Sequence, residues 1–498
     1  MTVQPPSYTQ FVQFQRLAKP CLSGLVDFLT QDHGIAGKII ALDLPSSEQS
    51  VAAPRLIAEA DLADFVNNTS AIHGRFLFVE DIRPQVINFL GEILNLDPVF
   101  FANHAVTDFG DVEKPAPPAL GLFPSQVAQL GHMHLHYQQV LDLGRVEAFR
   151  DLQYKLKTES NVARSVRLLP PLLARQLALA RGCCSVAVKS IRDTWICLVL
   201  VDPPVKRLVV EIGGAYSRMV HPCKPLNGGF EDFIPSATFA SFRDRNSTRE
   251  DYTWDRQSML GTLLHYFANH PPPGFTATRP STLSLCYYPT RIVLAEWILY
   301  TQLMSHYFKY HECKLQDIEN RLHANNIVDL QRWRRRSIQS QHKLRLLAEF
   351  IEYWLPHEPS DKQPWNLVLK DIQHLLSQLQ QYNRALKHVV PMATSMVQLL
   401  ESRRSMQEAA NVGRLTLIAT VFVPLSWVAG LFGMSEEYTP GHERFWVYWA
   451  AALPLLVLVL LLPALQRGLL AERLKEAMAV GSWRRVDVRS GSNRQELP

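Results

Sequence analysis

The sequence lacks the features that mark several common classes of protein. Its seven cysteines form no C-x-x-C pair and follow no regular spacing, which argues against a disulfide framework and fits a reducing compartment. It contains no Walker A loop and no G-x-G-x-x-G, H-E-x-x-H or G-x-S-x-G motif, so nothing in it predicts an enzyme or a prosthetic group. A net charge of +5 over 498 residues does not indicate a nucleic-acid partner. No apolar run in the first 25 residues is long enough for a signal peptide.

The sequence does contain two long apolar segments near its C-terminal end. Residues 415–432 and 445–465 comprise 18 and 21 residues without a charge, and about 20 such residues cross a bilayer core. The alternative is a core hairpin of a soluble fold, which would have to bury two helices that have no polar face. We therefore predict an integral membrane protein that spans the lipid bilayer at 415–433 and 445–465.

The charges beside these segments predict their orientation. Three basic residues precede the first segment and three follow the second, whereas the loop at 434–444 holds three glutamates and one arginine. Basic flanks remain in the cytoplasm, so both termini are expected to be cytosolic, including a tail at 466–498. We favour the plasma membrane, with an organelle membrane as the alternative.

The remainder of the chain is predicted to be a soluble α/β part followed by long helices. Apolar runs bounded by turn residues predict strands at 37–44, 74–82, 183–191, 194–203 and 207–212, and a helix is predicted at 84–94. We assign 1–30 to an N-terminal tail, 31–290 to a cytosolic α/β domain with a loop-rich insertion at 222–280, 291–365 to a helical hairpin region and 366–414 to a stalk helix.

The predicted stalk carries a heptad pattern. Two series of residues are spaced by seven: Ile372, Leu379, Leu386, Ala393 and Leu400, and Leu375, Tyr382, Val389 and Met396. Such a seam favours a stalk that bundles with copies of itself, although a helical hairpin within one soluble domain would show the same pattern. Pro391 lies inside the seam and is expected to kink it.

One face of the first apolar segment is small or polar. At about 100° per residue, six residues fall within an arc of about 120°: Thr416, Ala419, Thr420, Val423, Ser426 and Gly430. Trp427 falls on the same arc. This stripe predicts a face turned to water or to a neighbouring helix, and close packing by small residues is the alternative to a pore. Two helices per chain cannot enclose a pore, so a pore requires several copies.

The segment LTLIATVFVPLSWVAGLFGMSEEYTP, residues 415–440, resembles the pore helix and signature loop of the CorA superfamily. The resemblance implies a homopentameric channel for Mg²⁺ or another divalent cation, in which Ser426 and Gly430 face the pore. It also implies that Gly433, Met434 and Ser435 occupy the position of the external selectivity loop. The family has asparagine where this chain has Ser435.

The residues of the loop suit a cation entrance. Mg²⁺ gives up its waters reluctantly, so a mouth that offers oxygen acceptors to the hydrated ion avoids that cost. The hydroxyl of Ser435 is such an acceptor, shorter than an amide, and Glu436 and Glu437 repeated by symmetry would concentrate cations there. The alternative for the two glutamates is an ordinary solvated loop. Gly433 is expected to allow a sharp turn out of the helix.

A second candidate site is the segment HMHLHY. On a strand, His132, His134 and His136 would share one face, as metal ligands could. A half-exposed strand without a metal is the alternative.

Together these features predict an α+β cytosolic funnel domain, a long stalk helix and two C-terminal transmembrane helices. The predicted function is passage of a divalent cation down its electrochemical gradient. The alternative is a non-conducting membrane sensor or scaffold of the same architecture.

Overall fold

The computed structural model describes residues 7–31, 34–46, 52–106, 123–149, 154–172, 174–212, 218–233, 254–316, 324–359, 361–433, 441, 444–459 and 461. The chain divides into two units, residues 1–393 and 394–498, which are described separately. The long helix α12 (Gln363–Phe432) contributes residues to both units.

The first unit is built on a large mixed sheet. Its described strands are β1 (Lys38–Pro45), β2 (Arg55–Ile57), β3 (Ile72–Glu80), β4 (His132–Arg145), β5 (Tyr154–Thr158), β6 (Ser165–Leu168), β7 (Arg175–Ile191), β8 (Thr194–Val201), β9 (Arg207–Ile212), β10 (Arg218–Pro222) and β11 (Lys224–Pro225). The order is β10-β9-β5-β6-β7-β8-β3-β1-β2, and β4 pairs with β7 and β11. Among these strands β3 and β8 pair in parallel, and the other pairs are antiparallel.

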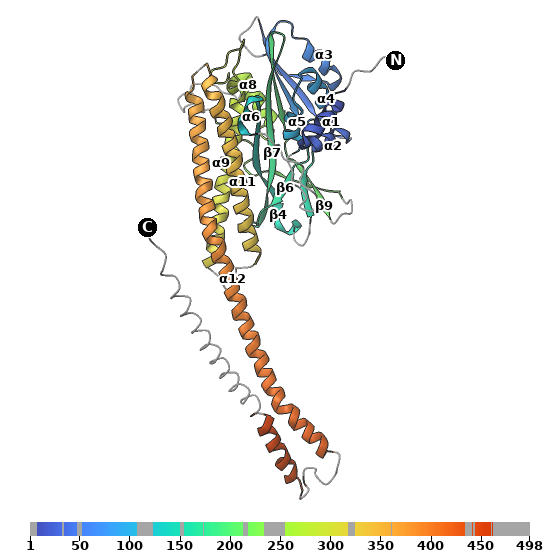
Figure 1. Ribbon diagram of the computed structural model, residues 1–498, viewed down its shortest axis with the longest axis vertical. Helices are drawn as coiled ribbons and strands as arrows, with labels where there is room; N and C mark the ends of the chain where they lie inside the picture. The colour runs from blue at the N-terminus through green and yellow to red at the C-terminus, as the bar shows by residue number, and fades with distance from the viewer. Residues whose placement is uncertain are drawn as a thin grey trace, which may run out of the picture. The chain divides into compact units, whose positions relative to one another are not determined.

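Short helices cover one face of the sheet (Figure 1). They are α1 (Tyr8–Ala18), α2 (Ser23–Thr30), α3 (Leu62–Asn67), α4 (Pro84–Ile93) and α5 (Pro98–Ala105). Their buried side chains form a core with those of β1, β3 and β8. Val12 of α1 and Leu25 of α2 are 0% exposed, so residues 8–30 are packed helices, and our assignment of 1–30 to a tail is wrong for them. The apolar spacing in YTQFVQFQRLA was the signal that we missed.

The opposite face of the sheet is covered by α8 (Met259–Asn269) and α9 (Thr282–Gln316). The ring of Phe267 lies 4.4 Å from that of Phe76 on β3, and the indole of Trp297 donates to the carbonyl of His136 on β4 at 3.1 Å. α8 lies within the insertion that we predicted to be loop-rich. α9 begins at Thr282, nine residues before the predicted helical hairpin region at 291–365, because it continues through Pro289.

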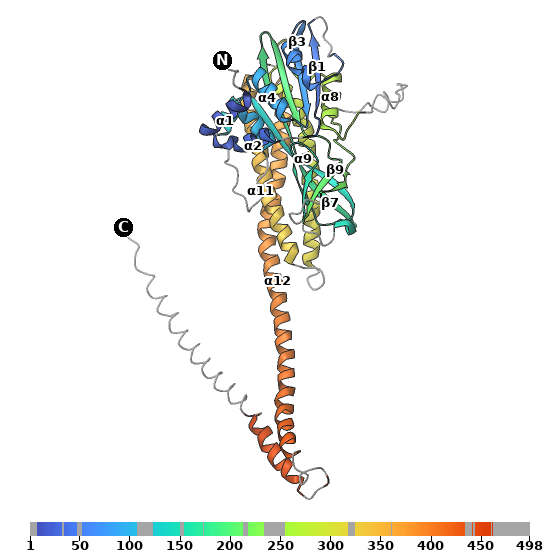
Figure 2. The ribbon, with the colours of Figure 1, turned by 90° about the vertical axis from the view of Figure 1, so that its right-hand side faces the viewer.

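Two further long helices complete the first unit. α11 (Ala324–Trp354) and the beginning of α12 lie alongside α9 (Figure 2). The guanidinium of Arg291 on α9 bonds to the carboxylate of Asp371 on α12 at 2.6 Å, and Ser337 of α11 donates to the carbonyl of Leu379 at 3.0 Å. The remaining described elements are α6 (Pro124–Gln129), η1 (Pro20–Leu22), η2 (Glu59–Asp61), η3 (Val146–Phe149) and η5 (Leu355–His357).

The heptad seam is buried as far as Ala393, but by α9 and α11 of the same chain. Ile372, Leu379 and Ala393 are 0% exposed within this single chain. The expectation that the whole seam packs against copies is therefore wrong for residues 372–393. Leu400, farther along, is only half-buried. The helix is continuous through Pro391.

Candidate functional site: the apolar end of α12

The last turns of α12 form an apolar helix that the chain leaves exposed. An 18-residue window of α12 has a mean hydropathy of 2.0 and is 6% buried, and among the described helices α12 alone is long and apolar enough to cross a membrane. A core helix of a soluble protein would be mostly buried, which this window is not. The next helix, Trp446–Val459, is apolar but shorter over its described length, so a second span at 445–465 remains a prediction.

The small and polar stripe of α12 lies on an open face. Of its six members, Thr416, Ala419, Val423, Ser426 and Gly430 are exposed and Thr420 is half-buried. A Cβ added at Gly430 would meet no atom within 4 Å. The hydroxyls of Thr416 and Thr420 donate to the carbonyls four residues earlier at 2.8 and 2.7 Å. These bonds satisfy the donors on the helix itself and leave the hydroxyl oxygens able to accept.

A different face of α12 packs within the second unit. Apart from Thr420 at the edge of the stripe, the buried or half-buried residues here are Val421, Pro424, Leu425, Val428 and Phe432. The ring of Phe432 lies 6.2 Å from that of Tyr448 on the following helix. At about 100° per residue this packed face is centred about 150° around the helix from the stripe. Packing within one chain therefore does not account for the small residues of the stripe.

Of the five residues of the predicted mouth, only Gly433, at the end of α12, is among the described residues. The helix ends at Phe432, and Gly433 still donates to the carbonyl of Ala429 at 2.8 Å. The φ of Gly433 is not in the left-handed region. The backbone at this position therefore does not make the sharp turn that we expected to require a glycine. A Cβ there would lie 3.0 Å from the carbonyl oxygen of Ala429, which is the remaining constraint. Four residues of the predicted mouth lie outside the described residues: Met434, Ser435, Glu436 and Glu437.

The three alternating histidines lie on β4, as predicted. His134 and His104 of α5 each place Nδ1 within hydrogen-bond distance of the hydroxyl of Ser185, at 2.8 and 2.9 Å. One hydroxyl can donate to only one of these nitrogens and must accept from the other, so the ring that accepts is neutral. Burial lowers the pKa of His134 and His136 well below the ordinary value, and the positive charges of Lys343 and Arg164 lower that of His136 further.

These histidines are not a metal site in the part of the chain that the structure describes. No group of three or more His, Cys, Asp or Glu residues there is arranged to hold a metal ion. The rings of His132 and His134 lie tilted against that of Phe100, with ring centroids 5.1 and 5.4 Å from it. His136 instead lines a separate cavity with Arg164 and Lys343. HMHLHY is a strand as predicted, but the alternative of a half-exposed strand is wrong about its exposure, because most of β4 is buried and His132 is 3% exposed.

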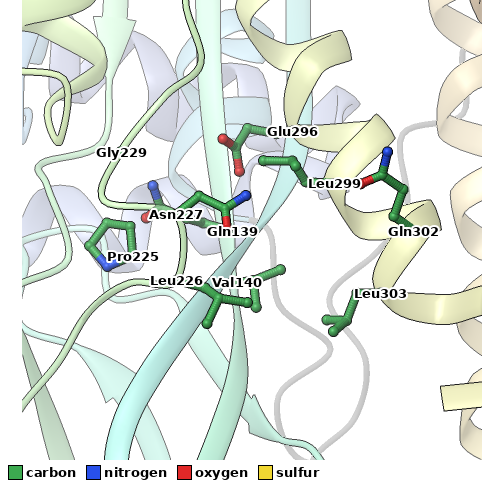
Figure 3. Close-up of a pocket in the computed structure, with 10 residues that line it drawn as sticks. All are labelled: Gln139, Val140, Pro225, Leu226, Asn227, Gly229, Glu296, Leu299, Gln302 and Leu303. Atoms are coloured by element: carbon green, nitrogen blue, oxygen red, sulfur yellow. The ribbon is translucent and has the colours of Figure 1, made fainter. Parts of the chain in front are cut away.

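A cavity of about 150 Å³ lies between β4, the loop after β11 and α9 (Figure 3). Glu296 of α9 turns its carboxylate into this cavity toward Gln139 and Asn227, although the residue is only 3% exposed. Burial, and secondly the charge of Glu231, raise the pKa of Glu296 to about 8. We did not predict a role for Glu296 from the sequence. Its signal was one acid within the apolar run IVLAEWIL.

The raised pKa makes the stability of the first unit depend on pH. The folded protein holds the proton of Glu296 more tightly than the unfolded chain, so this stabilisation is complete below the ordinary pKa of 4.5 and is lost as pH rises through about 8. We expect Glu296→Gln to remove this loss. Between pH 6 and 9 the thermal midpoint of the wild type should fall relative to that of the variant. The corresponding loss in the free energy of unfolding is several kcal/mol, at about 1.4 kcal/mol per pKa unit. Parallel curves would contradict the assignment.

Comparisons with known proteins relate the C-terminal part of the chain to a family. Residues 296–466 match the family model described as CorA-like Mg²⁺ transporter protein. No curated protein matches the chain. The solved structures that resemble it include the complete CorA magnesium transporter of Methanocaldococcus jannaschii, at 11% identity and TM-score 0.34, with 86% of this chain and 98% of that chain covered. The full-length CmaX protein matches at 13% identity and TM-score 0.36, with 88% of this chain and 100% of that chain covered.

The α+β domain continues through a long helix into an exposed apolar segment that is long and apolar enough to cross a membrane. The helical C-terminal part of the chain, residues 296–466, belongs to the CorA superfamily of divalent-cation transporters. The matched region includes α11, all of α12 and the described part of the following helix.

Proposed function

We propose that several copies of this protein form a pore that conducts a divalent cation of the Mg²⁺ kind, with α12 lining the pore. The observation that carries the proposal is the open stripe from Thr416 to Gly430. It is small and polar on an otherwise apolar helix, and it lies across the helix from the face that packs within the chain. A face of this kind within a bilayer turns to water or to another copy, and the family supplies the number of copies, five.

The proposed pore opens outward at residues 433–437. Both termini lie in the cytosol, and the loop acids Glu436 and Glu437 concentrate cations at the entrance. Ser435 presents its hydroxyl to the hydrated ion, which thereby keeps its waters. An inside-negative potential drives a divalent ion inward by about 4.6 kcal/mol per 100 mV, twice the single-charge value.

Substitutions at Ser435 test whether the mouth conducts. In liposomes containing the purified protein and a Mg²⁺ indicator, wild type is expected to show uptake that Ser435→Ala reduces severalfold, because each subunit loses one acceptor oxygen. Ser435→Asn is expected to keep uptake and to favour Mg²⁺ over larger ions, since it restores an amide acceptor. Reconstituted amounts are matched for all three proteins.

The same measurement decides against the proposal under two outcomes. If wild type shows no flux and Ser435→Asn alone creates it, the native protein is the non-conducting sensor or scaffold. If wild type conducts and neither substitution changes rate or ion preference, the ion enters elsewhere.

A further inference from the structure

The cavity beside Glu296 has the chemistry of a ligand site that the transport proposal does not use. Glu296 is 3% exposed, and no hydrogen bond or ion pair to its carboxylate occurs among the described residues. A buried carboxylate without a partner loses the solvation of its charge, which costs several kcal/mol unless the group is protonated or a cation is supplied. The carboxylate is turned into an open space of about 150 Å³ and not against a protein donor (Figure 3).

The rest of the lining combines oxygen acceptors with an apolar wall. Gln139 of β4, Asn227 of the loop after β11 and Gln302 of α9 bring side-chain amides to the cavity. The apolar residues are Val140, Pro225, Leu226, Leu299 and Leu303. One wall can therefore accept hydrogen bonds from a cation, and the other can contact methylene groups.

This lining suits an organic cation better than a metal ion. Ca²⁺ and Mg²⁺ take six or more oxygen ligands and usually more than one carboxylate or several waters. Here a single carboxylate faces a cavity that is half aliphatic, and the described residues contain no group able to hold a metal. An ammonium head needs only three acceptors, and an attached alkyl chain gains from the apolar wall.

We propose that this cavity binds a small primary alkylammonium ion, with the carboxylate of Glu296 as its counter-ion and the neighbouring amide oxygens as acceptors. The alkyl chain lies against Leu299, Leu303 and Val140. The proposal does not depend on ion conduction.

Binding at this site is coupled to proton release. Because the pKa of Glu296 is about 8, its carboxyl group is mostly protonated at pH 7 and must ionise to pair with an ammonium. The charged and titratable groups around it are Glu231, whose partner is Arg256 at 3.7 Å, and Tyr137, which stays neutral because its pKa is raised well above the ordinary value. Affinity is expected to rise by about tenfold per pH unit below pH 8 and to level off above it.

Calorimetric titration of the full chain in detergent with n-butylamine tests the proposal. One equivalent is expected to bind, and n-butanol, which has the same chain length but no charge, should bind at least tenfold more weakly. Glu296→Gln should lower the affinity at least tenfold, since a hydrogen bond to a charged group is lost, and Gln302→Leu severalfold. Glu312→Gln, an exposed acid on the same helix outside the cavity, is the matched control and should bind as wild type does.

Folding is monitored independently through the thermal midpoint, which Glu296→Gln is expected to maintain or raise. Three results would overturn the proposal: no butylamine bound by wild type, equal binding by wild type and Glu296→Gln, or equal binding of butylamine and butanol. Displacement of butylamine by Mg²⁺ at equal concentration would identify a metal site and would also refute it.

Discussion

Replacing Gly430 with phenylalanine is expected to reduce divalent-cation uptake to the level of protein-free liposomes. Gly430 lies on the stripe, and the space beyond its Cα is open in the single chain. If five copies of the stripe surround the ion path, five phenylalanine rings enter it at one level and exclude a hydrated ion. The measurement is Mg²⁺ uptake into liposomes that contain equal amounts of each protein.

The neighbouring residue offers a matched control. Ala429 is also small and exposed, but it lies about 100° from Gly430, outside both the stripe and the packed face. Under our assignment Ala429 faces lipid, so Ala429→Phe should leave uptake within about twofold of wild type. Equal loss in both variants would indicate a general effect on helix packing. Loss in Ala429→Phe alone would show that the pore-facing side is misassigned.

The strands and long helices could be predicted because their local patterns agree with their environment. The run TWICLVLV is apolar on both sides because helices cover both faces of β8, and all eight residues of β8 are buried. The segment at 84–94 begins with proline at a first helical turn and has one apolar face, and it forms α4. In such segments local and tertiary preferences point to the same structure.

Other features depend on partners that a sequence does not name. The heptad seam correctly predicted that Leu379 is buried, but periodicity cannot distinguish a copy of the chain from α11 as the partner. α8 was missed because Pro, Gly and Ser surround it, although its core residues Leu263 and Tyr266 are fully buried. The histidines suggested a metal through their spacing, while Ser185, whose hydroxyl bonds to the ring of His134, lies opposite it on the adjacent strand β7 but is far away in the sequence.

For the candidate pore, the sequence defined the stripe, and the structure added which face of the helix the chain itself covers. That information depends on the contact between Phe432 and Tyr448, which no period within α12 encodes. The cavity at Glu296 depends on three separate elements that meet only in the folded chain. The sequence indicates Glu296 as a single acid in an apolar run, but it does not indicate that the amides of Gln139 and Asn227 lie opposite it.

Replacing Leu379 with aspartate is expected to destabilise the folded first unit strongly. The side chain is 0% exposed, and its backbone carbonyl accepts bonds from Ser337 and Gln341 of α11. A buried charge without a partner costs about 3–5 kcal/mol, and the apolar contacts are lost as well. The thermal midpoint and the protease resistance of the first unit should both fall sharply.

Leu400→Asp separates packing within the chain from packing between copies. Leu400 continues the same seam beyond Ala393, where the single chain leaves it half-covered. If copies associate through this part of α12, the variant should dissociate on sizing in mild detergent while the midpoint of the first unit is unchanged. Leu399→Asp, at a neighbouring position that is 65% exposed, should do neither. If Leu400→Asp behaves like Leu399→Asp, the copies meet elsewhere. If Leu379→Asp dissociates the oligomer without lowering the midpoint, the seam at that position packs against copies, contrary to the structure.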